Sequence, residues 1–329
     1  MRLWFIVVLF VGLLGALGFV IYYRVSKPAD AAEKSSNIER GETPAVPSAG
    51  DSKPAPPKAT DPSVPAVLKR SALEKAIADA STAAHRGDAA AQARALTGGL
   101  ESIFQAGEPN AWRTGEPLLE ALRSVNEKLW YQSTGKFRCV QQKPAALAKV
   151  IANLTKQTPP VHVGIGLLAK MNRLADPNIV PGHKDLRVPI DSLSIRVFTK
   201  SYSLILYLGD YALDVFPIGI GKPETPTPIG KFEIVEIQHL DKYKREATRW
   251  VRPEDGKELY YGDAEYPFGR RFLKFAPPVE HYGIHGTDRD DAVGNSISHG
   301  CVRMFNSDVE VLASFLDPAM APRISVVIE

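Results

Sequence analysis

The sequence contains little cysteine: its 329 residues include only Cys139 and Cys301. His299 and Cys301 are close in the sequence, but no other pair of histidine and cysteine residues has the short spacing of a structural zinc motif. Runs of like charge and a basic stripe are also absent, and the formal net charge is +3, so the composition argues against a nucleic-acid-binding protein. Aromatic residues are absent between Lys27 and Pro65, where the chain cannot bury enough apolar surface to fold.

Charge is absent from Leu3 to Tyr23, a run of 21 residues. About 20 apolar residues cross a bilayer as a helix, so residues 1–24 are predicted to be a transmembrane anchor. A cleavable signal peptide is the alternative, because Ala29–Ala31 has the small-x-small form of a cleavage site. The apolar run exceeds the roughly 7 to 15 residues of the apolar core of a signal peptide, and Arg24 and Lys27 precede the cleavage site, which favours the anchor.

A disordered linker is predicted over residues 25–68. It contains eight prolines between Pro28 and Pro65. A spacer of this length reaches between roughly 35 Å as a coil and roughly 120 Å as a polyproline helix. A linker with this reach would let a membrane-anchored domain move through a layer of that depth above the membrane.

Helical periodicity predicts an α-helical region over residues 69–135. Ser71–Glu74 has the form of a capping box, which predicts a helix start at Ser71. The apolar face of this first helix is predicted to contain Leu73, Ile77, Ala80 and Ala84. A second helix is predicted over Asp88–Gln105, and a third is predicted to begin at Pro117.

Residues 136–190 are predicted to fold in the order strand, helix, helix, strand. The predicted elements are a strand at 137–140, helices at 145–154 and 165–174, and a strand at 186–189. This order, and the sequence from Leu168 to Pro189, resemble a LysM peptidoglycan-binding module. The usual Gly-Asp after the first strand is replaced by Gln142-Lys143, and a purely structural spacer domain is the alternative. Cys139 lies in the first strand beside Val140 and is predicted to be a small buried residue.

Residues 191–329 are predicted to form a β-rich domain, and about 139 residues are ample for one core. Leu193, Ile195 and Val197 alternate with polar neighbours, which predicts a strand. Further strands are predicted at 204–208, 211–218 and 324–328. One helix is predicted at 307–316, with Ser307–Glu310 as a capping box and Val309, Leu312 and Leu316 on one face.

The segment from Tyr282 to Met304 brings histidines, a cysteine and hydroxyl groups together among glycines. A thiol becomes a strong nucleophile when a nearby imidazole takes its proton. His299 lies two residues from Cys301 and would share its face in an extended segment, whereas His285 would arrive from an adjacent strand. Gly300 is expected to leave its own N–H and that of Cys301 free to stabilise an oxyanion. These residue types predict an acyl-transfer site.

Other interpretations of the same residues exist. A cysteine before a valine is often a small buried hydrophobic residue, and a histidine before a glycine is often a turn residue. A zinc site is a more specific alternative than ordinary structural residues, because histidine and thiolate are ligands that zinc prefers. Its ligands would be His281, His285, His299 and Cys301. The lack of a second short-spaced pair of ligands argues against it, so no metal or cofactor is predicted.

Two stretches resemble a known family. His285 followed by Ser298–Arg303, which reads Ser-His-Gly-Cys-Val-Arg, resembles the active-site signature of the YkuD-type L,D-transpeptidases. Thr227–Phe232 is similar to that family's Thr-Pro-x-Gly-x-Phe stretch. The resemblance runs from about Leu193 to the C-terminus. It implies a mainly-β sandwich or barrel domain with one or more helices at the end of a multidomain chain.

The resemblance also implies a reaction. Cys301 would attack the carbonyl of the third residue of a peptidoglycan tetrapeptide stem, release D-alanine and form a thioester. An amine of a neighbouring stem would then take the acyl group to give a 3-3 cross-link. His285 would be the base, the Gly286 carbonyl would orient it, and the Gly300 amide would hold the oxyanion. Carbapenem-type β-lactams would acylate the thiol.

Supporting roles are expected for Tyr282, Thr287, Ser298, His299 and Arg303. Arg303 would bind a substrate carboxylate or form a structural ion pair. A disulfide between Cys139 and the nucleophile would disable the site, so none is expected. The substrate requires the catalytic domain to lie outside the cytoplasm, in the periplasm or its equivalent. L,D-carboxypeptidase activity, D-amino-acid exchange and a mainly wall-binding tether remain as alternatives.

Overall fold

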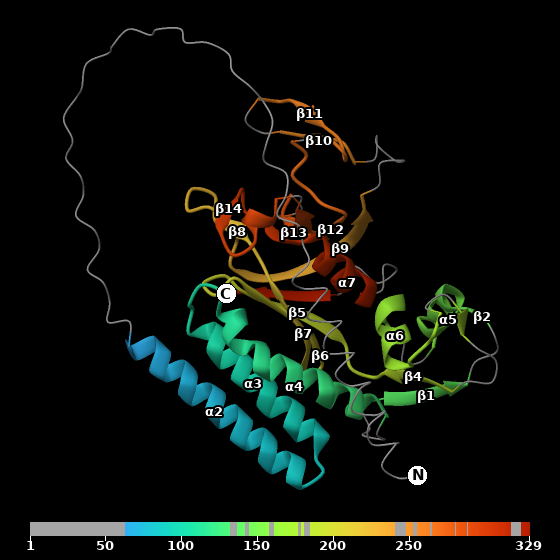
Figure 1. Ribbon diagram of the computed structural model, residues 1–329. Helices are drawn as coiled ribbons and strands as arrows, with labels where there is room; N and C mark the ends of the chain where they lie inside the picture. Colours follow the sequence, from blue (N-terminus) through green and yellow to red (C-terminus); the bar gives the residue numbers. More distant parts are fainter. Residues whose placement is uncertain are drawn as a thin grey trace, which may run out of the picture. The chain divides into compact units, whose positions relative to one another are not determined.

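The computed structural model of the chain describes most of its C-terminal four-fifths (Figure 1). The described residues are 63–131, 137–141, 145–157, 161–176, 179–180, 185–240, 248–252, 255–263, 265–279, 281–287, 289–316 and 324–329. All of them belong to one compact unit, Ala59–Glu329. The predicted transmembrane anchor and most of the predicted linker lie outside the described residues. Within these ranges, no helix is both long enough and apolar enough to span a membrane.

Three helices come first in the described chain. They are α2 (Ser63–His85), α3 (Ala89–Gln105) and α4 (Ala111–Tyr131), and they lie side by side (Figure 1). The prediction for α3 is confirmed, because the Asp88 side chain accepts a hydrogen bond of 2.9 Å from the Ala91 N–H and caps the helix start. Gly99 lets α3 approach α2 closely: a Cβ there would lie 2.4 Å from the Cβ of Ala76.

The predicted starts of α2 and α4 are wrong. Helix α2 begins at Ser63, so residues 63–68 of the predicted linker are helical and Ser71 is an interior residue. Pro65 fits the first turn, where the missing N–H would have no acceptor. Helix α4 begins at Ala111 and contains Pro117 in its interior. Tertiary packing outweighs the weak local signals, since Ala111 is buried.

The predicted apolar face of α2 is right in part. Ala80 is buried and Leu73 packs against the core, whereas Ile77 is 50% exposed and Ala84 is exposed. Among residues 71–85, Ala76 and Ala83 are buried instead. Small residues form the contact because α2 and α3 approach closely at Gly99, and hydrophobic periodicity favours larger side chains such as Ile77.

An eight-stranded mixed sheet forms the centre of the fold. Its spatial order is β15-β13-β12-β9-β16-β5-β6-β7. The strands are β5 (Leu193–Phe198), β6 (Ser203–Leu208), β7 (Tyr211–Pro217), β9 (Gly230–His239), β12 (Arg271–Phe275), β13 (Gly283–Thr287), β15 (Val302–Phe305) and β16 (Ile324–Ile328). The pairs β13–β15 and β16–β5 are parallel, and the other pairs are antiparallel. The predicted strands at 193–197, 204–208, 211–218 and 324–328 are thus confirmed.

Helix α7 (Asn306–Phe315) packs against β12, β13 and β15, on which the site is built. Val309 and Leu312 are buried as predicted. The predicted capping box is wrong, because no side chain caps this helix. Glu310 instead forms an ion pair of 2.7 Å with Arg271 on β12. The long-range ion pair replaces the local capping interaction.

Short elements complete the domain. They are β8 (Ile220–Gly221), β10 (Trp250–Val251), β11 (Glu258–Leu259), the 3-10 helix η2 (Asp290–Ala292) and β14 (Ser296–Ser298). Strands β8 and β14 pair in parallel, and β10 and β11 form an antiparallel hairpin (Figure 1).

The helical region covers β7, which is an edge strand of the sheet. The Ala212 N–H donates to Thr97 Oγ1 at 2.9 Å, and the Ala212 carbonyl accepts from Asn126 Nδ2 at 3.0 Å. Arg123 on α4 forms an ion pair of 2.8 Å with the buried Asp214 on β7. Helices α3 and α4 therefore satisfy polar groups that an exposed edge would leave to water or to another chain.

The region 136–190 has the predicted order of strand, helix, helix and strand. Its elements are β1 (Phe137–Gln141), β2 (Ala145–Ala146), α5 (Leu147–Leu154), α6 (Ile165–Met171), β3 (Ile179–Val180) and β4 (Asp185–Pro189). Strands β1 and β4 pair antiparallel, and β2 and β3 form an additional short pair. This region contacts α7, because the Gly164 N–H donates to the Phe315 carbonyl at 2.8 Å. A Cβ on Gly164 would lie 2.2 Å from the Ser314 carbonyl oxygen.

The prediction that Cys139 is buried is wrong. Cys139 is exposed, and both cysteines carry free thiols. The sheet of β1 and β4 has only two strands, and Cys139 lies opposite Arg187 in it. The sequence indicates a strand here but does not show which face of so small a sheet is covered.

Candidate active site

Strands β13 and β15 bring the predicted nucleophile and base together. Their parallel register pairs Ile284 with Val302 and His285 with Arg303. Cys301 directly precedes β15. Because side chains alternate along a strand, this register directs Cys301, Arg303 and His285 to one side of the sheet.

His285 is oriented by its own chain. Its Nδ1 lies 2.6 Å from the Gly286 carbonyl oxygen, which can only accept a hydrogen bond. Nδ1 therefore carries the proton, and in the neutral ring Nε2 has the free lone pair. A Cβ on Gly286 would lie 2.3 Å from Asn306 Oδ1, so glycine is needed there. The geometry expected for Gly286 is observed.

Burial keeps the His285 ring neutral. The rings of Phe268 and Phe272 approach it edge-on, with centroids 4.7 Å and 5.9 Å away. Burial lowers the pKa of His285 from 6.5 to about 3, the hydrogen bond to Gly286 opposes this shift, and the charge of Arg303 adds to it. At neutral pH the ring can accept a proton at Nε2.

The Cys301 thiol is also neutral at rest. Burial raises its pKa from 9.0 to about 11, and the Gly283 backbone and the charge of Arg303 only partly offset this effect. Sγ also lies 3.8 Å from the His281 carbonyl oxygen. The resting pair is therefore a thiol and an imidazole rather than a thiolate and an imidazolium. Attack by sulfur must be coupled to transfer of its proton.

Ser298 closes a tight turn around the cysteine. Its Oγ donates to the Cys301 carbonyl at 2.7 Å and accepts from the Gly300 N–H at 3.1 Å. Gly300 has a φ of +111°, and a Cβ there would lie 2.4 Å from Cε1 of Tyr282. Ser298 and Tyr282 are thus structural neighbours of the nucleophile, and glycine is required at the turn.

The expectation that the Gly300 N–H is free for an oxyanion is wrong, because Ser298 Oγ accepts its hydrogen bond. Of the two predicted donors, this leaves the Cys301 amide. His299 is exposed, whereas Cys301 is partly buried, and Gly300 between them has a positive φ rather than an extended conformation. The supporting role expected for His299 stays a prediction.

Two other predicted residues have clear surroundings. Thr287 is buried, and its hydroxyl accepts from the Arg289 N–H at 3.2 Å, which makes it a structural residue of β13. Arg303 is partly buried, and its Nε is buried without a hydrogen-bond partner. The described residues show no ion pair of Arg303 with a carboxylate. The described part of the chain also holds no group of three or more His, Cys, Asp or Glu residues placed to bind a metal ion.

The loop between β8 and β9 contains the start of the Thr-Pro-x-Gly-x-Phe stretch and contacts the turn that carries Cys301. The Gly221 N–H donates to Thr227 Oγ1 at 2.9 Å, and the Lys222 N–H donates to the Ser298 carbonyl at 2.9 Å. Thr225 Oγ1 donates to the same carbonyl at 3.3 Å. The Thr-Pro-x-Gly-x-Phe stretch was the only sequence signal for this loop.

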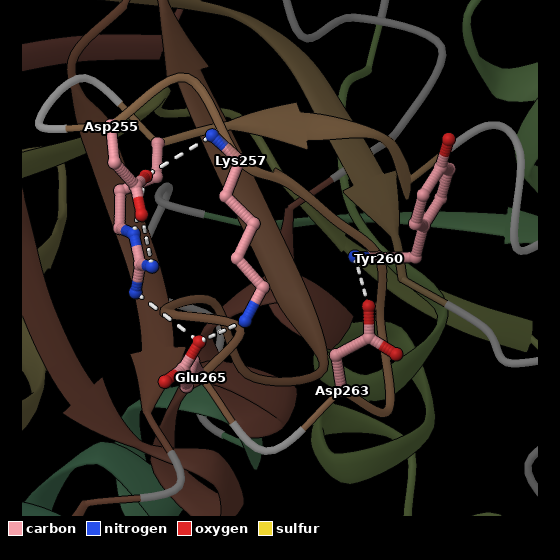
Figure 2. Close-up of polar contacts among 6 residues, drawn as sticks. Asp255, Lys257, Tyr260, Asp263 and Glu265 are labelled. Atoms are coloured by element: carbon pink, nitrogen blue, oxygen red, sulfur yellow. Dashed lines mark hydrogen bonds and ion pairs between the residues drawn. The ribbon is translucent and has the colours of Figure 1, made fainter.

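The segment between β9 and β12 links an exposed hairpin to the histidine. Leu240, Leu259 and Tyr266 form a small apolar cluster, against which Phe268 and Phe272 pack. Figure 2 shows polar contacts on this segment: Lys257 reaches Glu265 at 2.6 Å, and Asp263 accepts from the Tyr260 N–H at 2.9 Å. Such exposed ion pairs contribute little stability, so the aromatic cluster is the main support of His285 from this side.

A mainly-β domain that presents a thiol beside an oriented neutral imidazole defines a thiol-dependent acyltransferase. The L,D-transpeptidase catalytic domain family (YkuD) matches residues 193–328. YkuD of Bacillus subtilis, named as an L,D-transpeptidase, is 30% identical over 167 residues, which are 50% of this chain and 80% of that protein. Its namesake in Bacillus licheniformis is 34% identical over 140 residues, which are 42% of this chain and 67% of that protein.

Solved structures with detectable similarity have the same description. The catalytic domain of an E. faecium L,D-transpeptidase has 19% identity and a TM-score of 0.32, with 43% of this chain and 98% of that chain covered. A Mycobacterium tuberculosis L,D-transpeptidase has 15% identity and a TM-score of 0.32, with 46% and 64% covered. On the evidence of its sequence relatives, the chain belongs to the YkuD family. It is an L,D-transpeptidase, a cysteine-dependent acyltransferase that acts on peptidoglycan.

Proposed function

We propose that Cys301 is the nucleophile and His285 the base of a 3-3 cross-linking reaction. The observation that carries this proposal is the pairing of β13 with β15, together with the hydrogen bond that fixes His285 Nδ1 on Gly286. Sulfur attacks the carbonyl of the third residue of a tetrapeptide stem while its proton passes to His285 Nε2. That proton then goes to the amine of the departing D-alanine, and a thioester remains.

The second half of the reaction uses the same groups. The amine of a neighbouring stem attacks the thioester carbonyl and gives its proton to His285 Nε2. The carbon–sulfur bond breaks, and the thiolate recovers a proton from the imidazolium. The product is an amide bond between the third residues of two stems. The Cys301 amide is the donor proposed for the oxyanion in both halves.

Arg303 is proposed to bind a carboxylate of the substrate. Its buried Nε has no partner, and its charge acts on both Cys301 and His285. A substrate carboxylate would satisfy that donor and bring a counter-charge into the site. Arg303→Lys keeps the charge but loses the planar donor pair, so it is expected to raise KM for the tetrapeptide more than it lowers kcat.

Three further properties are proposed, from the family resemblances and from the apolar run near the N-terminus. Carbapenem-type β-lactams acylate Cys301, since they offer a strained acyl group to the same thiol. The E. faecium catalytic domain is described in one structure as acylated by ertapenem. The segment 136–190 binds peptidoglycan glycan as a LysM-like module, and an N-terminal anchor within residues 1–24 holds the domain outside the cytoplasm.

Mass spectrometry of the full chain with a disaccharide-tetrapeptide tests the reaction. Loss of alanine and appearance of a dimer are expected for wild type and Cys139→Ser, but not for Cys301→Ala. Loss of alanine without a dimer would identify a carboxypeptidase, and replacement of alanine by an added D-amino acid would identify exchange. If wild type and Cys301→Ala both bind peptidoglycan sacculi and neither converts the tetrapeptide, the wall-binding tether would be favoured.

A further inference from the structure

The loop that joins β8 to β9 lies directly against the turn that carries Cys301. Strands β8 and β14 lie side by side (Figure 1) and pair in parallel. In this pairing Gly221 lies opposite Ser298. A Cβ on Gly221 would lie 2.9 Å from the Cα of Gly300 and 2.2 Å from the Thr225 carbonyl oxygen. The two backbones therefore touch, with no side chain between them.

One hydroxyl group fixes the path of this loop. Thr227 is 5% exposed, and its Oγ1 accepts the Gly221 N–H at 2.9 Å. Lys222, which follows Gly221 in the chain, donates its N–H to the Ser298 carbonyl at 2.9 Å. Ser298 in turn holds both ends of the Cys301 turn through its own hydroxyl. A continuous series of short contacts thus runs from Thr227 to the nucleophile.

We propose that Thr227 is a positioning residue for Cys301. Its hydroxyl holds the loop at Gly221, and the loop holds Ser298 and the cysteine turn in the orientation that acylation needs. This inference rests on the proposed role of Cys301 as nucleophile. Thr227 lies outside the reacting atoms, so its loss slows acylation and leaves substrate binding nearly unchanged.

The chain offers a matched control. Thr97 is 3% exposed, and its Oγ1 accepts the Ala212 N–H at 2.9 Å, which is the same kind of hydrogen bond at the same length. It lies on α3 against the edge strand β7, outside the site. Thr227→Val and Thr97→Val therefore remove the same hydroxyl from equally buried positions, and only Thr227 belongs to the contacts that reach Cys301.

The experiment measures kcat and KM for D-alanine release from the tetrapeptide by the full chain. Thr227→Val is expected to lower kcat by roughly 10- to 100-fold with KM within about twofold, the size that a small misplacement of a reacting group produces. Thr227→Ser should restore most of kcat. Thr97→Val should shift the urea midpoint of unfolding but keep the wild-type kcat.

Equal loss of kcat in Thr227→Val and Thr97→Val would overturn the positioning role, and so would a loss confined to KM. If Thr227→Val does not fold, Thr225→Val removes a donor to the Ser298 carbonyl and should lower kcat by about threefold or more with KM unchanged. An unchanged kcat in that variant would also overturn the proposal. If wild type forms no thioester at all, the proposed function fails rather than the positioning role.

Discussion

The buried neutral His285 makes a quantitative prediction about stability and pH. His285→Asn removes the titrating ring, while the asparagine amide can still donate a hydrogen bond to the Gly286 carbonyl. In the folded protein the pKa of His285 is about 3, below its ordinary value of 6.5. Between these values the unfolded chain binds the proton and the folded chain does not, so stability falls as pH falls.

The expected size follows from the two pKa values. Below pH 6.5 the wild type loses about 1 kcal/mol or slightly more of unfolding free energy per pH unit through this residue, or roughly 2 to 3 kcal/mol between pH 7 and pH 4.5. Urea unfolding of both proteins at several pH values in this window measures the difference, because every other titrating group is common to both. The stability curves should converge as pH falls. Parallel curves would refute the account of a buried, neutral imidazole.

Three further predictions concern the site and its support. Ser298→Ala leaves the buried Gly300 N–H without an acceptor, which should cost about 1–3 kcal/mol in urea unfolding and lower kcat. The rate at which iodoacetamide alkylates Cys301 in a Cys139→Ser background should rise with pH with a midpoint of about 11, and a midpoint at the ordinary 9.0 would contradict the raised pKa of this thiol. Gly164→Ala places a methyl group against the backbone of α7 and should destabilise the protein by about 1–3 kcal/mol, measured by urea unfolding.

Local patterns predicted the elements whose signal is strong. The alternation of Leu193, Ile195 and Val197 identified β5, and Asp88 identified the start of α3. The short distance in sequence from His285 to Cys301 placed both residues in one site, and parallel pairing of β13 and β15 brings them onto neighbouring strands.

Errors occurred where long-range packing decides the outcome. Ile77 is exposed because α2 and α3 meet through small residues, which hydrophobic periodicity does not favour. The positive φ of Gly300 interrupts the extended path on which a shared face for His299 and Cys301 depended. The Gly300 N–H is occupied by Ser298, a contact that depends on how the turn closes. The part played by Thr227 depends on the pairing of β8 with β14, which joins segments more than seventy-five residues apart in the chain.

The central claim is that Cys301 carries the acyl group. Peptide-mapped mass spectrometry of the protein, quenched early during reaction with the tetrapeptide, tests it most directly. An adduct equal to the substrate minus D-alanine is expected on the peptide that contains Cys301, in wild type and in Cys139→Ser. An adduct on another residue, or cross-linked dimer formed by Cys301→Ala, would contradict it.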